Sequence, residues 1–569
     1  MSSRRRILRS ATAAAAGLAA VAAPLVASPS FAEEDQVRPD ASAPTVAFDL
    51  RHELGGDVPE NFVGLSIEWS LVERYMGENA RPTFGNLLAN LGTGVLRIGG
   101  SSQDVMRFDP DAANTNEVIT PDDLVDIRAT LDAVNEGGQR KRPAWGVVLG
   151  TAMSPVSDRR PFVSPQHART FVTQGVAPVF SGDAARDVAG IELGNEPDLS
   201  YRSHLDSYLQ DLRTYSDASV TGPFPVIAPN TSEDILPWES IDGRSVPTRY
   251  FWDWPKILDV IGPVAGERAG VFGVYASDHF YPLARTCRNK PYRCPSTEAL
   301  LSDRHMSSLD YQVFTHAREA TEHGLGYRLE ETNTAAGRGA DGVSNVAASA
   351  TYALDMMFHA ACPQPPQPGA ANADCSTRAI GVNLHNAEVR AFFSPEEGNA
   401  YYNVVDYDAS PAMGAPSAAP EYYALLLFSR FAQGASGLRP VHVAGTDMDL
   451  VKGWRVEGPD GARRLFLINK SDHPVRIRVG VPTASALVDR MTPYDPEGAG
   501  RTLDAPGVRI DGREVRPDGT WPGFAPTRRA VRGEQMDLEM APGEAVVVRV
   551  RDDETSNTEQ DTTTTGAGR

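Results

Sequence analysis

Two short polar strings in the sequence carry carboxylates where acid–base chemistry is possible. Asn195-Glu196-Pro197 closes one apolar run, and Glu330-Glu331 closes a later one. Two carboxyl groups facing each other across a cleft can cleave a glycosidic bond. One attacks the anomeric carbon, and the other protonates the departing oxygen and later deprotonates water. Each string alone also fits an ordinary turn or a solvated face, so the elements that position them must decide.

Eight short apolar runs recur through the middle of the chain, and helical patterns fill most of the gaps. Asp122–Asn135, for example, has Leu124, Ile127 and Leu131 near helical spacing. Strands that alternate with helices predict a parallel sheet, and eight such units predict an α/β fold, the (β/α)8 TIM barrel. The expected strands are Phe62–Glu68, Gly94–Gly100, Ala144–Gly150, Ala189–Asn195, Phe224–Asn230, Val271–His279, Tyr327–Asn333 and Ile380–Asn386.

Catalytic groups of a barrel gather at the carboxyl ends of its strands. Glu196 follows the fourth expected strand, and Glu331 lies on the seventh. Period-two alternation puts Leu329, Glu331 and Asn333 on one face and Glu330 on the other. Because Leu329 suits the filling of the barrel, we expect Glu331 rather than Glu330 to face the mouth. Glu331 is then the expected nucleophile and Glu196 the expected acid/base.

Polar motifs occur in a fixed order at the ends of these strands. They are FVGLSIE at 62–68, LRIGGSSQD at 96–104, IELGNEPD at 191–198, HFYP at 279–282, RLEETNT at 328–334, GVSN at 342–345, GVNLH at 381–385 and PEYY at 420–423. Together they resemble glycoside hydrolase family 79, the heparanases and microbial β-glucuronidases, within the clan of retaining (β/α)8 glycosidases. The resemblance covers about residues 45–550.

The resemblance implies a double displacement by Glu196 and Glu331, and a sugar-binding set. That set is Glu68, Arg97, Asn195, Tyr281, Asn333 and His385. Tyr281 is expected to hydrogen-bond the nucleophile, and Arg97 alternatively pairs with carboxylates in the barrel mouth. We interpret His279 as a core histidine and Glu192 as a partner for a basic group inside the barrel.

Two positions depart from the family pattern where its β-glucuronidases hold the sugar carboxylate. Where the family commonly has Gly-Gly after the nucleophile motif, the run here is Ala336-Gly337-Arg338-Gly339. Phe393 stands where a tyrosine commonly follows the strand-eight histidine. We expect Arg338 to replace both contacts by a charge-assisted hydrogen bond. The alternative is that Arg338 faces solvent and the pocket accepts a different sugar. The favoured function is an exo-acting β-glucuronidase. The alternatives are a neutral-sugar glycosidase of the same clan, such as an arabinofuranosidase or xylosidase, and a non-catalytic carbohydrate-binding protein on the same scaffold.

The sequence pattern changes near Leu438, where short strand-like runs alternate with Gly, Pro and Asp turns. This predicts an all-β sandwich, to which Thr45–Leu50 should contribute a strand. The expected organisation is a signal peptide at 1–32, a sandwich from 42–58 plus 438–551, a catalytic barrel at 60–434 and a disordered tail at 552–569.

The N-terminus predicts export. Ser3–Arg9 is basic, an uncharged Ala-rich run extends to Ala27, and Ser30-Phe31-Ala32 suits cleavage. Paired arginines suggest the twin-arginine route and a secreted protein. A membrane anchor is the alternative, but the apolar run is short for one.

Cysteine usage and charge narrow the remaining classes. In an oxidising compartment the natural disulfides are Cys287–Cys294 and Cys362–Cys375, whose spacing does not suit a zinc site. The net charge of −20 argues against a nucleic-acid partner. We expect a carbohydrate substrate, no cofactor or metal, and no membrane association after signal removal. The sequence does not indicate the oligomeric state.

Overall fold

The computed structural model describes most of the 569-residue chain. The expected signal peptide at 1–32, the tail at 552–569 and Phe393 lie outside the described residues. The described residues are 44–47, 55–112, 117–135, 143–157, 160–232, 252–267, 270–287, 293–364, 372, 374–387, 399–407, 414–445, 450–498 and 500–550.

Parallel strands form a nearly closed barrel, in the order β8-β7-β6-β3-β2-β14-β12-β10-β9. The fifth expected strand is divided at Ala228-Pro229 into β8, which pairs with β7, and β9, which pairs with β10. One short segment therefore borders both ends of the sheet, and the predicted barrel is confirmed. The strands are β2 (Val63–Glu68), β3 (Gly94–Gly99), β6 (Trp145–Thr151), β7 (Val188–Leu193), β8 (Val226–Ile227), β9 (Pro229–Thr231), β10 (Tyr275–Phe280), β12 (Gly326–Thr332) and β14 (Val382–Asn386).

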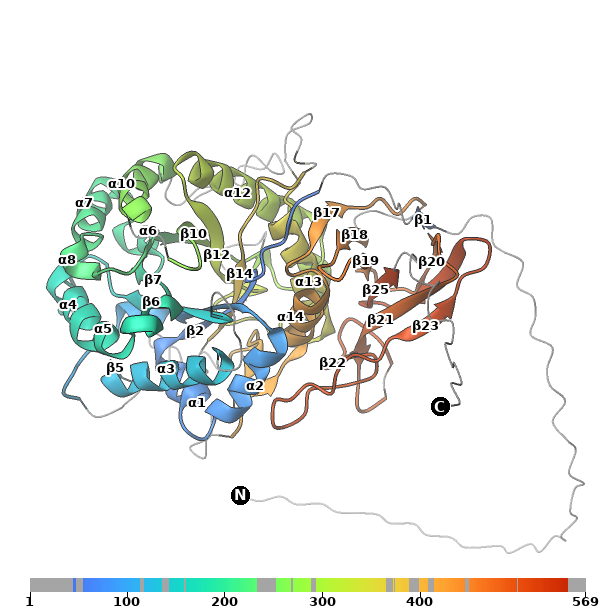
Figure 1. The fold of residues 1–569 in the computed structure, drawn as a ribbon, viewed down its shortest axis with the longest axis horizontal. Helices are drawn as coiled ribbons and strands as arrows, with labels where there is room; N and C mark the ends of the chain where they lie inside the picture. Colours follow the sequence, from blue (N-terminus) through green and yellow to red (C-terminus); the bar gives the residue numbers. More distant parts are fainter. Residues whose placement is uncertain are drawn as a thin grey trace, which may run out of the picture. The chain divides into compact units, whose positions relative to one another are not determined.

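Helices surround these strands (Figure 1). In α3, Pro121 occupies the first turn, where proline is favoured. The Asp123 carboxylate accepts a hydrogen bond from the Thr120 backbone N–H, a contact that stabilises the start of a helix. Its apolar stripe, Leu124, Ile127 and Leu131, is buried. The helices are α1 (Val72–Met76), α2 (Arg81–Leu91), α3 (Pro121–Asn135), α4 (Pro165–Thr170), α5 (Ala177–Val179), α6 (Pro197–Tyr201), α7 (Leu205–Tyr215), α8 (Ala218–Thr221), α10 (Trp254–Glu267), α11 (Thr297–Leu300), α12 (Asp303–Glu322), α13 (Ala347–Ala361) and α14 (Pro420–Phe431).

Short two-stranded ribbons extend the loops of the barrel. They are β4 (Arg107–Phe108) with β5 (Val118–Ile119), β11 (Leu283–Ala284) with β13 (Ala335–Ala336), and β15 (Val405–Asp406) with β16 (Ser417–Ala418). The β11–β13 ribbon directly follows β10 and β12, so it ties together the chain segments that leave the carboxyl ends of these two strands.

The C-terminal part is all-β, as predicted. Antiparallel alternation is clear in β24, where Met536, Leu538 and Met540 are buried between exposed neighbours. β1 pairs in parallel with β20, so the N-terminal strand joins the C-terminal sheet. One sheet contains β17 (Ser436–Pro440), β18 (Val451–Glu457), β19 (Arg463–Asn469), β25 (Ala545–Val550), β21 (Ser485–Tyr494), β22 (Gly507–Ile510) and β23 (Thr527–Ala530), and the other contains β1 (Thr45–Ala47), β20 (Val475–Gly480) and β24 (Gln535–Met540).

Buried contacts join this β domain to the barrel helices. Phe358 of α13 stacks on Trp454 of β18, with ring centroids 5.3 Å apart. The Lys470 ammonium donates to Asp303 and Asp355 carboxylates, both at 2.8 Å. Apolar stacking and a buried charge cluster therefore fix the surface between barrel and β domain.

Both predicted disulfides are present, Cys287–Cys294 and Cys362–Cys375. Within the described part of the chain, no helix combines the length and apolar composition needed to cross a bilayer.

Candidate active site

A tight turn after β7 aims Glu196 at the barrel mouth. Gly194 has φ +75°, and a Cβ there would lie 2.5 Å from the Met153 carbonyl oxygen, so only glycine fits. Glu196 itself has φ +46°, a conformation that costs a non-glycine residue about 1 kcal/mol or more. Pro197 then begins α6. The side chain of Glu196 remains 21% exposed and can reach a substrate.

A β-bulge on β12 positions Glu331. Leu329 lies opposite Asp278 of β10, but the next pair is Glu331 opposite His279. One extra residue, Glu330, therefore interrupts the ladder, and the register against β14 shifts at the same place. The strict alternation expected from the sequence is wrong here, because a bulge turns two successive side chains toward one side.

Contacts show where the two adjacent carboxylates point. Arg328 donates to the Asn383 side chain inside the barrel at 2.7 Å, and Glu330 lies 3.4 Å from the same guanidinium. Glu331 instead meets Arg97 and Tyr281. Both glutamates thus face the barrel interior, with different partners, and Leu329 belongs to the large hydrophobic cluster that includes the helices.

Four groups surround the Glu331 carboxylate, which is 7% exposed. Arg97 Nη1 donates to Oε2 at 2.6 Å, and the Tyr281 hydroxyl donates to Oε1 at 2.7 Å. His385 Nδ1 lies 3.7 Å and His279 Nδ1 4.0 Å from Oε2. Burial alone would raise the pKa of Glu331, but the two histidines, Arg97 and Tyr281 outweigh it and hold this pKa well below its ordinary value. Glu331 is therefore ionised, as a nucleophile must be.

Glu196 lies beside this anion. A carboxylate oxygen of Glu196, one of Glu331 and a ring nitrogen of His279 all lie within 4.8 Å of one another. Glu196 Oε1 is 3.3 Å from His279 Nδ1. Burial lowers the pKa of His279, but Glu331 and Glu196 more than compensate, so this pKa is raised. From the sequence, His279 is expected to be a core residue. It is fully buried, yet it bridges the two carboxylates.

Arg97 of β3 organises the floor of the site. It is fully buried and donates to Glu192, Glu331, Ser66 and the Asn195 side-chain oxygen. Asn195 is therefore oriented by Arg97 rather than by solvent. The observed contacts agree with the alternative expected from the sequence, in which Arg97 pairs with carboxylates in the barrel mouth.

Glu68 and His385 lie on neighbouring strands at the mouth. Glu68 Oε2 accepts from the Ser102 backbone N–H at 2.7 Å, and Glu68 Oε1 is 3.6 Å from His385 Nε2. His385 Nδ1 pairs with the Ser66 hydroxyl at 2.8 Å. Both side chains are therefore held in place, and the His385 ring also lies next to Glu331.

Asn333 has a different position from the other expected sugar ligands. Its amide nitrogen donates to the His385 and Tyr402 backbone carbonyls, and its oxygen accepts from the Thr334 N–H. These contacts use the whole amide group, so Asn333 braces the segments that carry His385 and Tyr402.

Arg338 lies in a loop after β13 with unusual backbone geometry. Gly337, Arg338 and Gly339 have φ of +84°, +74° and +78°, and Arg338 is 7% exposed. Its carbonyl accepts from the Tyr401 N–H at 2.8 Å. This backbone conformation favours glycine and costs free energy for an arginine. The cost suggests that the Arg338 side chain has a function.

Tyr402 contributes a buried phenol that no sequence motif predicts. Its ring stacks on Tyr281 with centroids 6.0 Å apart, and it meets His385 edge-on at 5.9 Å. It is 4% exposed, and burial and then the charge of Glu331 raise its pKa. Phe393, which stands where the family has a tyrosine, lies outside the described residues. Among the described residues, Tyr402 is a phenol close to Glu331, in addition to Tyr281.

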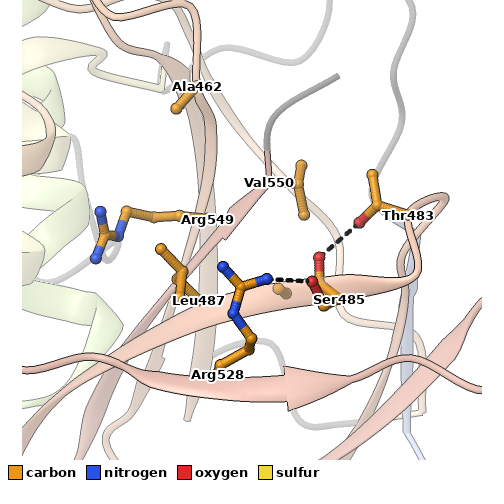
Figure 2. Close-up of a pocket in the computed structure, with 8 residues that line it drawn as sticks. Ala462, Thr483, Ser485, Leu487, Arg528, Arg549 and Val550 are labelled. Carbon is orange, nitrogen blue, oxygen red and sulfur yellow. Dashed lines mark hydrogen bonds between the residues drawn. The ribbon is translucent and has the colours of Figure 1, made fainter. Parts of the chain in front are cut away.

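A pocket of about 210 Å³ opens beside Glu196. Its lining is Ser101, Asp104, Arg160, Asn195, Glu196, Leu199 and Ser200. A second hollow of about 340 Å³ lies on the β domain, where Arg528 donates to the Ser485 hydroxyl (Figure 2). None of the described residues that line this second hollow is acidic. The acid–base chemistry therefore belongs to the pocket at Glu196.

Glu196, His279 and Glu331 also form a possible metal-ligand group, since their donor atoms are mutually close. Carboxylates and imidazole suit divalent ions. However, the guanidinium of Arg97 lies 2.6 Å from Glu331 Oε2, and its fixed positive charge opposes a cation on that oxygen. The donor set fits proton transfer better than metal binding.

No protein-family model matches the sequence, and no curated protein sequence matches it. Solved structures of glycosidases do match the fold. The 4-O-α-L-rhamnosyl-β-D-glucuronidase of Fusarium oxysporum 12S is similar with a TM-score of 0.62 and 15% identity, over 89% of this chain and 100% of that one. The GH51 arabinofuranosidase of Xanthomonas axonopodis pv. citri gives 0.53 and 13%, over 89% and 99%. A monomeric β-xylosidase of Caulobacter crescentus CB15 gives the same values.

At such identities the similarity establishes the fold alone. The chain has the (β/α)8 fold of the clan GH-A glycosidases, with a C-terminal β domain. Its chemistry depends on the residues of its own site.

Proposed function

We propose that this protein is a retaining glycoside hydrolase. The observation that carries the proposal is the pair of carboxylates, Glu196 and Glu331, with oxygens within 4.8 Å of each other. Retaining enzymes keep their carboxyl groups about 5–5.5 Å apart, whereas inverting enzymes need about 6.5–9.5 Å to admit water. The short separation favours attack by Glu331 itself.

In the first step a Glu331 oxygen forms a bond to the anomeric carbon while the bond from that carbon to the leaving oxygen breaks. Glu196 gives its proton to that oxygen. In the second step water attacks the anomeric carbon, Glu196 takes the water proton, and the ester bond to Glu331 breaks. Arg97 and Tyr281 hold the Glu331 carboxylate in place for both steps.

We further propose that the sugar is a β-glucuronide. Arg338 supports this, because it is nearly buried, its backbone carbonyl accepts from the Tyr401 N–H next to Tyr402, and a guanidinium suits a carboxylate. The similar Fusarium protein is a 4-O-α-L-rhamnosyl-β-D-glucuronidase, which points the same way. We also propose that the protein is exported, with a mature chain beginning at Glu33. Its two disulfides favour an oxidising compartment. N-terminal sequencing of the extracellular protein tests this.

The test of substrate class is hydrolysis of matched p-nitrophenyl glycosides: β-glucuronide, β-glucoside, β-galactoside, β-xyloside and α-L-arabinofuranoside. We expect kcat/KM for the glucuronide to exceed that for the glucoside at least about 100-fold, the scale of one charged contact. Cleavage of a neutral sugar with no glucuronide activity would contradict the uronate assignment. Binding without turnover of any glycoside would contradict the enzyme assignment.

The variant R338G removes the guanidinium of Arg338 and tests its role independently of the backbone conformation of the loop. We expect it to lose most of the preference for glucuronide over glucoside while the backbone of the loop keeps its conformation, since glycine readily adopts φ +74°. R202G is the matched control, because Arg202 is an exposed arginine with φ +57°. It should keep the wild-type preference. An unchanged preference in R338G would contradict the role of Arg338.

A further inference from the structure

Glu192 is a buried carboxylate that the double displacement does not use directly. It lies on β7 below the turn that carries Glu196 and is fully buried. Its two oxygens accept from Nε and Nη2 of Arg97, both at 2.6 Å. This is the two-pronged geometry that fixes a guanidinium most firmly.

All the donors of Arg97 have acceptors. A guanidinium has five N–H groups. Nε and one hydrogen of Nη2 go to Glu192, and the other Nη2 hydrogen goes to Asn195 at 2.8 Å. The two Nη1 hydrogens go to Ser66 at 3.0 Å and to Glu331 at 2.6 Å. Arg97 therefore has one orientation, and one positive charge is shared between two carboxylates.

This sharing matters because Glu331 changes charge during the reaction. When Glu331 becomes an ester it loses its negative charge, and a nearby positive charge opposes that step. When the ester breaks the charge returns, and the same positive charge favours that step. In a buried site with little water, such effects are large. A carboxylate that offsets part of the Arg97 charge therefore shifts the balance between the two steps.

We propose that Glu192 is a positioning residue that, through Arg97, sets the relative rates of formation and breakdown of the glycosyl–Glu331 ester. The inference rests on the proposed retaining mechanism. Other charged or titratable groups near this cluster are His279, His385, Glu68, Glu196, Tyr281, Tyr402, Asp104, Tyr275, Glu330 and Arg328. Among the contacts of Arg97, the negative partners are Glu192 and Glu331.

The test measures the two steps separately in E192Q. The kcat/KM for a p-nitrophenyl glycoside reports ester formation. Breakdown is followed by reactivation of enzyme trapped with the 2-deoxy-2-fluoro glycosyl fluoride of the same sugar. We expect ester formation to slow about tenfold and reactivation to speed up about tenfold, because the full Arg97 charge then acts on Glu331. Loss of structure alone would slow both.

Three further variants make the test specific. E192D keeps the charge, so the ratio of the two rates should stay near the wild-type ratio even if both rates fall. E330Q removes a carboxyl group from the same barrel interior that pairs with Arg328 rather than with Arg97, so it should change the ratio much less than E192Q does. E192N serves as the neutral variant if E192Q does not fold, as judged by thermal unfolding.

The results distinguish this inference from the proposed function. If wild-type protein hydrolyses no glycoside and is not trapped at Glu331, the retaining mechanism itself fails. If wild-type protein does both, but E192Q slows both steps or E192D shifts the ratio as much as E192Q does, the charge-sharing role of Glu192 is wrong.

Discussion

At the residue scale, the two candidate carboxylates differ most in what surrounds them. Glu331 is nearly buried and meets Arg97 and Tyr281, so its charged form is stabilised. Glu196 has its side chain 21% exposed and has His279 at 3.3 Å. One group is held as an anion, and the other lies at the open pocket where a leaving group would depart. This difference assigns the nucleophile and the acid/base.

The first prediction concerns E196A. Because Glu196 protonates the leaving oxygen, we expect hydrolysis to fall at least about 1000-fold for an alkyl glycoside but far less for a dinitrophenyl glycoside, which needs little protonation. Azide should then speed turnover of the dinitrophenyl substrate, since it attacks the glycosyl ester without a general base and fits the space left by the carboxyl group. Product analysis should find the β-glycosyl azide.

E331A is the comparison for this prediction. It lacks the nucleophile, so it should lose activity on both substrates to a similar extent. Should E196A lose activity equally on both substrates, with no azide product, Glu196 is not the acid/base.

The sequence could predict some of these residues but not others. Glu196 and Glu331 follow from the rule that barrel chemistry lies at strand ends, which is local information. His279 had a usable signal, because it is two residues before Tyr281 and alternation puts both on one face. Tyr402 had none. It comes from a loop after β14, and only three-dimensional packing brings it to Tyr281.

At the element scale, irregularities in the strands position the site. The bulge at Glu330 turns Glu331 toward Arg97, and the sequence pattern gives no warning of it, since Glu-Glu reads equally well as regular strand. The division of the fifth strand at Ala228-Pro229 is likewise invisible to periodicity. The number of strands was predictable because each strand appears as a run of several apolar residues. A single inserted residue leaves no such pattern, so the bulge was not predictable.

The second prediction concerns the Cys287–Cys294 disulfide, which closes a loop at the barrel mouth. Arg293 in this loop is buried and donates to the backbone carbonyls of Tyr281 and Leu283, at 2.5 and 2.8 Å. In C287S/C294S we expect unfolding free energy to fall by about 2–3 kcal/mol. We also expect kcat to fall several-fold, because the Tyr281 hydroxyl is no longer held on Glu331.

C362S/C375S is the matched control. Cys362 follows α13, whose C-terminus returns the chain toward the amino ends of the strands, away from the mouth. Its sequence separation is 13 residues, against 7 for the other disulfide, so the loss of stability should be at least as large. Its kcat should stay near wild type. Equal loss of kcat in both variants would show a general effect of destabilisation instead.

At the scale of the whole molecule, the architecture was the most predictable feature. Alternating strands and helices gave the barrel, and the change of texture near Leu438 gave the β domain, because both follow from patterns repeated over many residues. The buried charges between them were not predictable. Lys470 of the β domain pairs with Asp303 and Asp355 of the barrel helices. These residues are far apart in the sequence, and no local pattern predicts that they pair.

Buried carboxyl groups spread over the molecule give a third prediction, about pH and stability. Burial raises the pKa of Asp104, Asp198 and Asp489, each to about 7. In the unfolded chain these groups ionise near their ordinary value of 3.8. The folded state therefore holds protons more tightly, and the stability that this adds is full below about pH 4 and is lost as pH rises to about 7.

Groups of the opposite kind set the acid side. Desolvation alone would raise the pKa values of Asp303 and Asp355, but Lys470 and neighbouring bases outweigh it and lower them, so their contribution is lost as pH falls below about 4. Stability should therefore peak at mildly acidic pH. We expect the unfolding midpoint, scanned at one fixed heating rate, to be about 5 °C higher at pH 5 than at pH 8. D104N removes one of the responsible groups and should flatten this slope. A midpoint that rises from pH 5 to pH 8 would mean that these buried carboxyl groups do not control the stability of the folded protein.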